Sequence, residues 1–295
     1  MSEKPRVHRN EPLRSYTSWR VGGPADLLCR PASLGELQMF LAEVPAEMPV
    51  TWLGLGSNVL VRDGGIRGAV ICTSGLPRLI ERLDAGRVRA GAGVPCATLA
   101  RRCVRFKLGP AAFFAGIPGS VGGALAMNAG AYGAETWERV ESVATIDRAG
   151  VVHERSRAKY HVGYRRVTGP PGEWFVSAVF ALESNRDGEA LAMKELLQAR
   201  SATQPLGRPN AGSVFRNPPG DFAGRLIEAA GLKGRRQGGA VVSEKHANFI
   251  VNEGQATAAD VEGLIETVRK TVEERTGVAL ELEVRALGAP AGGHS

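Results

Sequence analysis

A glycine-rich stretch, residues 115–133, is the part of this sequence whose residue types point most directly to chemistry. Glycine has no Cβ, so the main-chain N–H groups around it can come within hydrogen-bonding distance of a bound group. Phosphate is the usual ligand of such loops. The stretch is almost uncharged and follows the apolar pair Phe113–Phe114, whereas a solvated linker is normally polar. It therefore predicts a buried loop that faces a ligand.

A second glycine turn lies earlier in the chain, at Gly54 and Gly56, and is followed by the polar side chains of Ser57 and Asn58. This turn is not the fingerprint of a dinucleotide-binding Rossmann fold, because that motif needs a third glycine and a helix directly after the turn. Here the apolar residues 59–61 continue as a strand. We expect the two glycine turns to converge on one ligand.

The composition is that of an ordinary globular protein. Of the 295 residues, 43% are hydrophobic, which is enough for at least one good core. No run approaches the roughly 18 apolar residues of a membrane span, and the N-terminus lacks the apolar core of a signal peptide. We therefore expect a cytoplasmic protein with no membrane segment.

The net charge of +7 leaves two classes of partner open. A basic nucleic-acid-binding module is one of them, but the 37 Lys and Arg residues are scattered and do not interleave with aromatic residues in a stripe. An acidic small molecule accounts for the charge equally well. We therefore expect a small-molecule ligand and no nucleic acid.

The helix and strand patterns around the glycine turns indicate an α+β region over residues 1–184, with an internal boundary near 75–85. Ser33 with Glu36 predicts a capped helix in it. A polar break then begins a second domain over 185–288, and a disordered tail follows at 289–295. In the second domain, Asp221 predicts the cap of a helix over 222–230, and Thr257 with Asp260 predicts a longer helix.

The last predicted strand, Val278–Arg285, alternates strictly between apolar and charged residues. The alternation puts Leu282 and Val284 on one face and Glu283 on the other. The pattern alone indicates that Glu283 lies on a solvated outer face.

Several familiar catalytic patterns are missing from the sequence. It has no GxxxxGK[ST] phosphate loop, no HExxH and no GxSxG elbow. The five histidines are spread singly, so we assign no metal site. The spacing of Cys29, Cys72, Cys96 and Cys103 fits neither a zinc ribbon nor a redox CxxC pair, and predicts reduced core residues.

An ordered set of motifs, from about residue 15 to 288, resembles the UDP-N-acetylenolpyruvoylglucosamine reductase family, in its shorter type. Each motif alone is modest, and the ordered set is highly specific. The matching segments are 17–25, 54–61, 115–124, 127–133, 164–165, 211–218, 245–252 and 283–285.

The resemblance implies a fold and a cofactor. The fold is an FAD-binding region of the vanillyl-alcohol oxidase type, made of two α+β subdomains, followed by an α/β substrate-binding domain. FAD would lie extended across the two glycine turns, which agrees with what the glycines indicate by themselves. The residues implied in cofactor binding are Gly54, Gly56, Ser57, Asn58, Val59, Pro118, Gly119, Ser120, Gly122, Gly123 and Asn128.

The resemblance also implies an activity, the NADPH-dependent reduction of the enolpyruvyl group of UDP-N-acetylglucosamine enolpyruvate to give UDP-N-acetylmuramate for peptidoglycan. By motif match, Arg165 and Glu283 would stabilise the charge that develops on the substrate carboxylate, and Ser213 would donate a proton to the α-carbon. A guanidinium suits this role because it stays charged and can bind a carboxylate with two hydrogen bonds.

Further residues are implied in substrate binding. Tyr164 identifies Arg165, rather than Arg166, as the arginine of the motif, although Val162 and Val167 replace the aromatic and serine residues usual in the family. The diphosphate of a UDP-sugar needs cations. The candidates are Arg216, Arg235, Lys233 and Arg236.

A different FAD-dependent oxidoreductase of the same fold is the main alternative. Such an enzyme would share the glycine turns but would not need Ser213 together with Glu283. The sequence carries no signal for oligomeric state or for the choice between NADPH and NADH, and a monomer is the simplest expectation.

Overall fold

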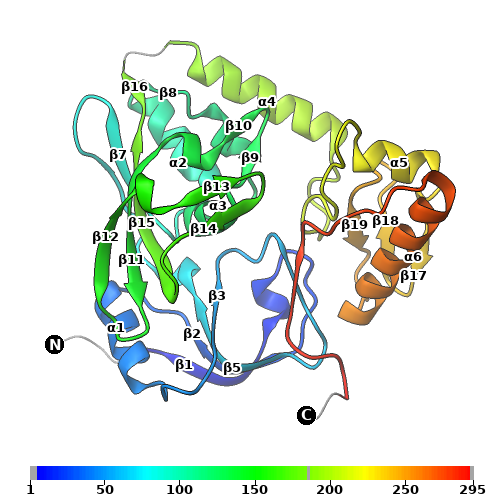
Figure 1. Cartoon of the computed structure of the whole chain (residues 1–295), viewed down its shortest axis with the longest axis horizontal. Helices are drawn as coiled ribbons and strands as arrows, with labels where there is room; N and C mark the ends of the chain where they lie inside the picture. The colour runs from blue at the N-terminus through cyan, green and yellow to red at the C-terminus, as the bar shows by residue number, and fades with distance from the viewer. Residues whose placement is uncertain (1–4, 185–186, 293–295) are drawn as a thin grey trace. The chain divides into compact units, whose positions relative to one another are not determined.

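The computed structural model describes residues 5–184 and 187–292, which form two compact units whose segments alternate along the chain (Figure 1). The first unit consists of Met1–His8, Leu27–Leu55 and Gly68–Arg200, and the second of Arg9–Asp26, Gly56–Arg67 and Ser201–Ser295. The predicted domain boundary at 184/185 adjoins residues outside the described part. Each compact unit consists of separate segments of the chain, so the units do not test the predicted domain limits. Those limits stay predictions.

The main sheet of the first unit has the strand order β12-β11-β15-β7-β6, with antiparallel neighbours throughout (Figure 1). Its core joins apolar side chains of the sheet, such as Val143 and Phe180, to Leu99, Phe114 and Leu125 from the segments packed against it. The strands are β6 (Ile80–Arg82), β7 (Arg87–Gly91), β11 (Val140–Asp147), β12 (Val152–Ser156) and β15 (Glu173–Ala181), and the helices are α2 (Cys96–Arg105) and α3 (Val121–Met127).

Another sheet has the order β1-β2-β5-β3, from β1 (Val7–Pro12), β2 (Pro24–Cys29), β3 (Val50–Leu53) and β5 (Ile66–Cys72). Helix α1 (Leu34–Glu43) packs Leu37 and Phe40 against Cys29 and Ile71. The Ser33 side chain accepts a hydrogen bond from the Glu36 N–H at 3.1 Å, which confirms the predicted start of this helix.

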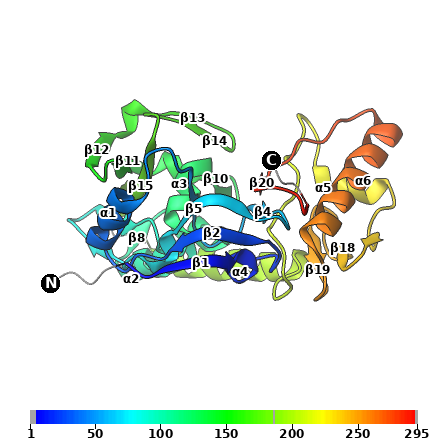
Figure 2. The ribbon, with the colours of Figure 1, turned by 90° about the horizontal axis from the view of Figure 1, so that it is seen from below.

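The core of the second unit joins a small antiparallel sheet, β17-β18-β19, to two helices (Figures 1 and 2). The elements are β17 (Arg236–Gln237), β18 (Ala240–Val242), β19 (Ile250–Asn252), α5 (Ala223–Ala229) and α6 (Ala258–Thr276). Next to them, β20 (Arg285–Leu287) pairs in parallel with β4 (Val59–Val61). The mixed helix and strand content confirms the predicted α+β class.

Shorter elements complete the described chain. The strands are β8 (Leu108–Gly109), β9 (Gly130–Ala131), β10 (Ala134–Glu135), β13 (His161–Gly163), β14 (Arg166–Thr168) and β16 (Glu183–Ser184), and α4 covers Glu189–Thr203. Short 3-10 turns lie at Leu13–Tyr16, Thr73–Gly75, Ala112–Gly116, Thr136–Glu138 and Arg157–Lys159.

Two predicted helix starts have different outcomes. The capping box of Thr257 and Asp260 at the start of α6 is confirmed, and the helix ends at Gly277 with a φ of 72°. The predicted cap at Asp221 is wrong, because α5 begins after Phe222, which makes no side-chain cap. The Ala223 N–H donates instead to the Asn217 side chain at 3.1 Å.

The two regions of greatest chemical interest also differ from the sequence pattern. The glycine-rich stretch contains a helix, α3, which the low helix propensity of glycine did not indicate. The predicted strand Val278–Arg285 is wrong, since β20 begins only at Arg285 and the earlier part makes a single bridge between Phe215 and Leu282. Leu282 is exposed and Glu283 is half-buried, against the predicted faces, whereas Val284 is buried as predicted.

The cysteines and the tail can be compared with their predictions. All four cysteines are buried and unpaired, as predicted, and burial raises the pKa of the Cys29, Cys96 and Cys103 thiols to about 12. Ala289 exchanges backbone hydrogen bonds with Gly64 and Gly65, and the predicted limit at 288 stays a prediction. Residues 293–295 of the predicted tail lie outside the described part.

Replacing Thr257 with Ala removes the side-chain oxygen that caps α6 and should lower the free energy of unfolding by about 1 kcal/mol. Thr271→Ala, at a position inside the same helix, is the matched control and should leave stability nearly unchanged. Denaturant unfolding followed by circular dichroism measures both. Equal losses in the two variants would contradict a capping role for Thr257.

Candidate active site

A pocket of about 270 Å³ lies within the first unit and brings the two glycine-rich regions together. Gly54 comes from the turn after β3, and Gly122 and Gly123 come from α3. The other residues around it are largely aromatic or apolar. The lining residues are Trp52, Leu53, Gly54, Thr73, Gly122, Gly123, Ala126, Tyr160, Val167, Gly169, Pro170, Glu173, Trp174 and Phe175.

The two glycine turns meet at Gly54 and Ser120. A Cβ on Gly54 would lie 2.6 Å from Ser120 Oγ, so a larger residue would displace that side chain. Ser120 is buried, and its Oγ accepts a hydrogen bond from the Gly123 N–H at 3.3 Å, which fixes the start of α3. Glycine at position 54 thus permits the close approach that the sequence predicted between the turns.

The pocket also contains hydrogen-bond donors that the described structure does not use. Trp52 Nε1 and Tyr160 Oη are buried and have no partner among the described residues. Burial raises the pKa of Tyr160 to about 12, so its hydroxyl stays protonated. Because a buried donor without a partner is unfavourable, these two groups favour a pocket that a bound molecule completes.

Arg165 lies at the turn between β13 and β14, in the left-handed conformation with a φ of 53°. Its guanidinium donates to the carbonyls of Asn128 and Gly130 at 3.2 and 3.3 Å, and stacks over the Tyr164 ring at 4.8 Å. Glu135 lies 3.8 Å away. Side-chain contacts therefore hold a non-glycine residue in a conformation that is unfavourable in isolation, as is common at functional sites.

Asn128, a predicted cofactor residue, uses its side chain within the protein. The side-chain amide donates to Glu135 at 2.6 Å and to the Gly163 carbonyl at 3.1 Å, and its oxygen accepts from the Trp137 N–H at 3.1 Å. These bonds connect the end of α3 to the hairpin that carries Arg165. They favour a positioning role for Asn128.

Ser213 and Glu283 lie on adjacent segments of the second unit. The Glu283 N–H donates to the Val214 carbonyl at 2.9 Å, next to Ser213 in the chain. Ser213 is half-buried. The sequence pattern indicated a solvated face for Glu283, whereas the structure makes it half-buried and pairs its backbone with Val214, the residue after Ser213.

Asn248 holds the Ser213 segment in place. Its side-chain oxygen accepts from the Phe215 N–H at 2.9 Å, its amide donates to the Phe215 carbonyl at 2.8 Å, and its backbone carbonyl accepts from the Val214 N–H at 2.9 Å. Sequence reasoning gave Asn248 no role, although it lies in the quoted motif 245–252. The signal available in the sequence was an asparagine among the apolar residues of segment 247–251.

The predicted cofactor residues Gly56, Ser57, Asn58 and Val59 belong to the second unit. A Cβ on Gly56 would lie 2.1 Å from the Tyr16 carbonyl, so glycine is needed there for packing. Asn58 donates to the Glu283 carbonyl at 3.2 Å and accepts from the Arg285 N–H at 3.1 Å. Val59 pairs with Arg285 in the ladder of β4 and β20, and Ser57 between them is half-buried. Pro118 and Gly119 stay in the first unit, next to Ser120.

The predicted substrate cations differ in their surroundings. Arg216 lies 3.5 Å from the exposed Glu281, and its buried Nε has no partner among the described residues. Arg235 is exposed and has no ion pair within the described part. Lys233 pairs with Glu228 at 2.6 Å, and Arg236 pairs with Glu253.

The described chain offers neither a metal site nor a membrane-spanning helix. No three His, Cys, Asp or Glu side chains gather there in a way that could hold a metal ion. None of the described helices combines the length and apolar character needed to span a bilayer.

Two protein-family models match the chain. Residues 25–156 match an FAD binding domain, and residues 204–287 match the C-terminal domain of UDP-N-acetylenolpyruvoylglucosamine reductase. The first match contains Gly54 and the 118–123 segment, and the second contains Ser213 and Glu283.

Similar proteins cover nearly the whole chain. UDP-N-acetylenolpyruvoylglucosamine reductase from Alkalilimnicola ehrlichii is 58% identical over 94% of this chain and 93% of its own length. The enzyme of that name from Methylococcus capsulatus is 57% identical over 95% and 92%. The crystal structure of the reductase from Thermus caldophilus has a TM-score of 0.83 and 36% identity, and covers 96% of this chain and 100% of that one.

The pocket of the first unit fits the flavin cofactor that these matches indicate. It offers glycines that permit close approach, aromatic walls such as the stacked pair Trp52 and Trp174, and two unused donors. Gly123 is a suitable position for testing this fit. A Cβ there would meet only Ser120 Oγ, at 3.6 Å, so the protein itself leaves room for a side chain. A larger side chain is thus compatible with the fold but would occupy pocket space.

We expect Gly123→Val to weaken FAD binding about 10- to 100-fold, as overpacking of about 1–3 kcal/mol would do. Ala97→Val, in α2 and away from the pocket, is the matched control for adding a β-branched residue to a helix. The measurement is fluorescence titration of the apoprotein with FAD. Unchanged affinity in Gly123→Val would remove α3 from the cofactor site.

Proposed function

Because the chain belongs to the UDP-N-acetylenolpyruvoylglucosamine reductase family and is an FAD-dependent oxidoreductase, we propose that it uses NADPH to reduce the enolpyruvyl group of UDP-N-acetylglucosamine enolpyruvate. The product would be UDP-N-acetylmuramate, a precursor of peptidoglycan. The observation that supports this most is the pairing of the Ser213 and Glu283 segments, since another flavin enzyme of this fold has no need of that pair.

Arg165 is proposed to stabilise negative charge on the substrate carboxylate. Its guanidinium is already oriented by two backbone carbonyls and by the Tyr164 ring, so little reorganisation is needed when charge develops. The neighbouring Arg166 is exposed, whereas the side chain of Arg165 is only 15% exposed. This difference supports Arg165 as the arginine that acts.

Ser213 is proposed to give a proton to the α-carbon of the substrate, and Glu283 to stabilise the enolate-like carboxylate. The half-buried Ser213 hydroxyl is of the type that can transfer a proton to a substrate carbon. Serine is a weak acid, so it can act only on a strongly basic carbanion held beside it. The bonds from Asn248 and Asn58 keep the two segments in register.

The chemistry that bound FAD would supply is redox chemistry, the transfer of a hydride from NADPH to the enolpyruvyl double bond. The protein's part is to hold the cofactor and to manage charge and protons. We propose that backbone groups of Gly54, Pro118, Gly119 and Ser120, with Gly122 and Gly123, contact the cofactor. Gly56, Ser57, Asn58 and Val59 are also proposed as cofactor-binding residues.

For the UDP-sugar we propose Tyr164, Arg216 and Arg235 as binding residues. Arg216 and Arg235 keep unused N–H donors, which supports their assignment to the diphosphate. We further propose that the enzyme acts as a monomer in the cytoplasm, where nucleotide-linked sugars and NADPH are found.

The activity is tested by the visible absorption spectrum of the purified protein under anaerobic conditions. Flavin bands should bleach on addition of NADPH and return on addition of the enolpyruvyl UDP-sugar. A flavin that only oxygen reoxidises would instead identify an oxidase of the same fold, and a colourless protein that takes up no FAD would contradict the proposal.

Replacing Ser213 with Ala should leave flavin reduction by NADPH nearly intact and slow the sugar-dependent reoxidation by about 10²–10⁴-fold, the usual loss when a general acid is removed. Stopped-flow absorbance separates the two half-reactions. Ser201→Ala, within α4, is the control and should change neither. Equal slowing of both half-reactions by Ser213→Ala would reject its role as proton donor.

A further inference from the structure

The side chain of Glu135 lies beside Arg165, and the function proposed above gives it no role. Oε1 of Glu135 is 3.8 Å from Nη1 of Arg165. The same nitrogen donates to the Asn128 carbonyl at 3.2 Å, and Nη2 donates to the Gly130 carbonyl at 3.3 Å. One carboxylate and two carbonyls are thus gathered around this guanidinium.

The second carboxylate oxygen of Glu135 holds Asn128. Oε2 accepts a hydrogen bond from the Asn128 side-chain amide at 2.6 Å. Asn128 has a φ of 47°, in the left-handed region, at the end of α3. Because its backbone carbonyl is one of the two that bind Arg165, Glu135 acts on the guanidinium in two ways. It attracts the positive charge directly, and it fixes the residue whose carbonyl orients that charge.

The backbone of Glu135 is itself fixed against the segment that binds the guanidinium. Glu135 pairs with Gly130 across the short ladder of β9 and β10. A Cβ on Gly130 would lie 2.4 Å from a backbone oxygen of β10 and 3.1 Å from Glu135 Cγ, so the strands approach too closely for a larger residue. The next residue, Thr136, donates from its N–H and its hydroxyl to the Ala129 carbonyl, at 3.0 and 2.6 Å. The carboxylate therefore has little freedom to move relative to the carbonyls of 128–130.

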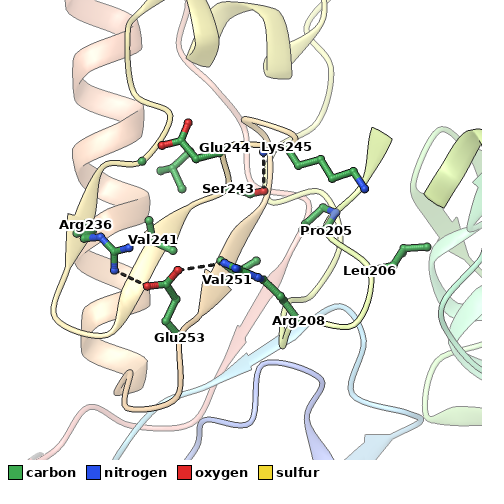
Figure 3. Close-up of a pocket in the computed structure, with 12 residues that line it drawn as sticks. Pro205, Leu206, Arg208, Arg236, Val241, Ser243, Glu244, Lys245, Val251 and Glu253 are labelled. Atoms are coloured by element: carbon green, nitrogen blue, oxygen red, sulfur yellow. Dashed lines mark hydrogen bonds and ion pairs between the residues drawn. The ribbon is translucent and has the colours of Figure 1, made fainter. Parts of the chain in front are cut away.

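Burial makes the charge of Glu135 important for Arg165. The Arg165 side chain is 15% exposed and that of Glu135 is 30% exposed. Figure 3 shows a contrasting arrangement in a pocket of the second unit, where Arg208 and Arg236 donate to Glu253. Those two arginine side chains are 62% and 59% exposed, so water screens their pairing with the glutamate. Less water reaches the Arg165 guanidinium, so loss of the nearby carboxylate would leave its charge poorly compensated.

We propose that Glu135 is a positioning residue that acts through Arg165 and holds the guanidinium where the substrate carboxylate gains charge. The inference rests on the proposed function, in which Arg165 stabilises that carboxylate. Displacement of a group by about 1 Å can cost about 100-fold in rate, because stabilisation of the transition state depends on placement. Glu135 therefore affects the reduction of the sugar substrate, and neither FAD binding nor the reduction of FAD by NADPH.

Stopped-flow absorbance of the holoenzyme at saturating sugar substrate measures this effect. Glu135→Gln keeps an oxygen for Asn128 but removes the negative charge, and should slow the sugar-dependent reoxidation of the flavin about tenfold. Glu135→Ala removes both contacts and should slow it about 100-fold. Flavin reduction by NADPH should be nearly unchanged in both variants. Glu138→Gln is the matched control, because it removes the same charge three residues away, beside Arg139 rather than Arg165.

A double-mutant cycle with Arg165→Lys tests whether Glu135 acts through Arg165. Lysine keeps a positive charge but lacks the planar guanidinium that binds the Asn128 and Gly130 carbonyls. In the Arg165→Lys background, Glu135→Gln should slow reoxidation much less than it does in the unmodified enzyme. Additive slowing by the two substitutions would show that Glu135 acts independently of Arg165, and would overturn the proposal.

Crystal structures of the variants give a measurement that does not depend on turnover. In Glu135→Gln and Glu135→Ala, the Arg165 guanidinium should move away from the Asn128 and Gly130 carbonyls toward solvent, and in Glu138→Gln it should stay. Thermal unfolding and FAD content verify that each variant keeps its fold and its cofactor. A guanidinium that stays in place in both Glu135 variants would overturn the proposal, as would unchanged reoxidation in both.

The failure of the proposed function is distinguishable from the failure of this inference. If the sugar substrate does not reoxidise the flavin of the unmodified enzyme, the proposed function fails. The crystal structures then still decide whether Glu135 places Arg165.

Discussion

Buried asparagine side chains hold the loops that carry the proposed chemistry in both units. Asn128 supports the hairpin of Arg165, and Asn248 supports the segment of Ser213. Loop backbones lack the partners that a sheet or helix supplies, yet their N–H and C=O groups must still be satisfied when they are buried. A carboxamide provides both a donor and an acceptor, so one buried asparagine side chain can form the backbone hydrogen bonds that a neighbouring strand would otherwise form. These side-chain hydrogen bonds hold each loop rigid.

The fixed loops allow the structure to keep unusual backbone conformations where the chemistry is proposed. Asn128, Tyr132 and Arg165 all have positive φ values, of 47°, 56° and 53°, although none is glycine. They lie close together in the fold, since the Arg165 guanidinium donates to the Asn128 and Gly130 carbonyls. Such strain persists only where surrounding contacts determine the conformation. The arginine is therefore set in place before a substrate binds.

The second unit distributes its cations unevenly. Arg216 and Arg235 have few protein partners, whereas Arg208 and Arg236 share one carboxylate. An arginine without a strong counter-ion in the protein can form an ion pair with a negatively charged diphosphate. The pair of arginines at Glu253 instead holds a fixed geometry within the protein.

Local pattern by itself determined the α+β class, the capped starts of α1 and α6, and the family with its flavin. These depend on residues close together in the chain, such as Thr257 with Asp260, or on motifs whose order can be read directly from the sequence. Only the tertiary structure decided the surroundings of Glu283. Its alternating segment indicated an exposed face, but the partners of that segment are Asn58 and Val214, which are far away in sequence.

The tertiary structure also decided two other features. Helix α3 forms in a glycine-rich stretch because Ser120 caps it and its apolar face packs in the core. Arg208 and Arg236 meet at Glu253 only once the sheet is folded. Hydrogen bonds between distant segments carry no local signature, and for that reason the sequence alone could not reveal them.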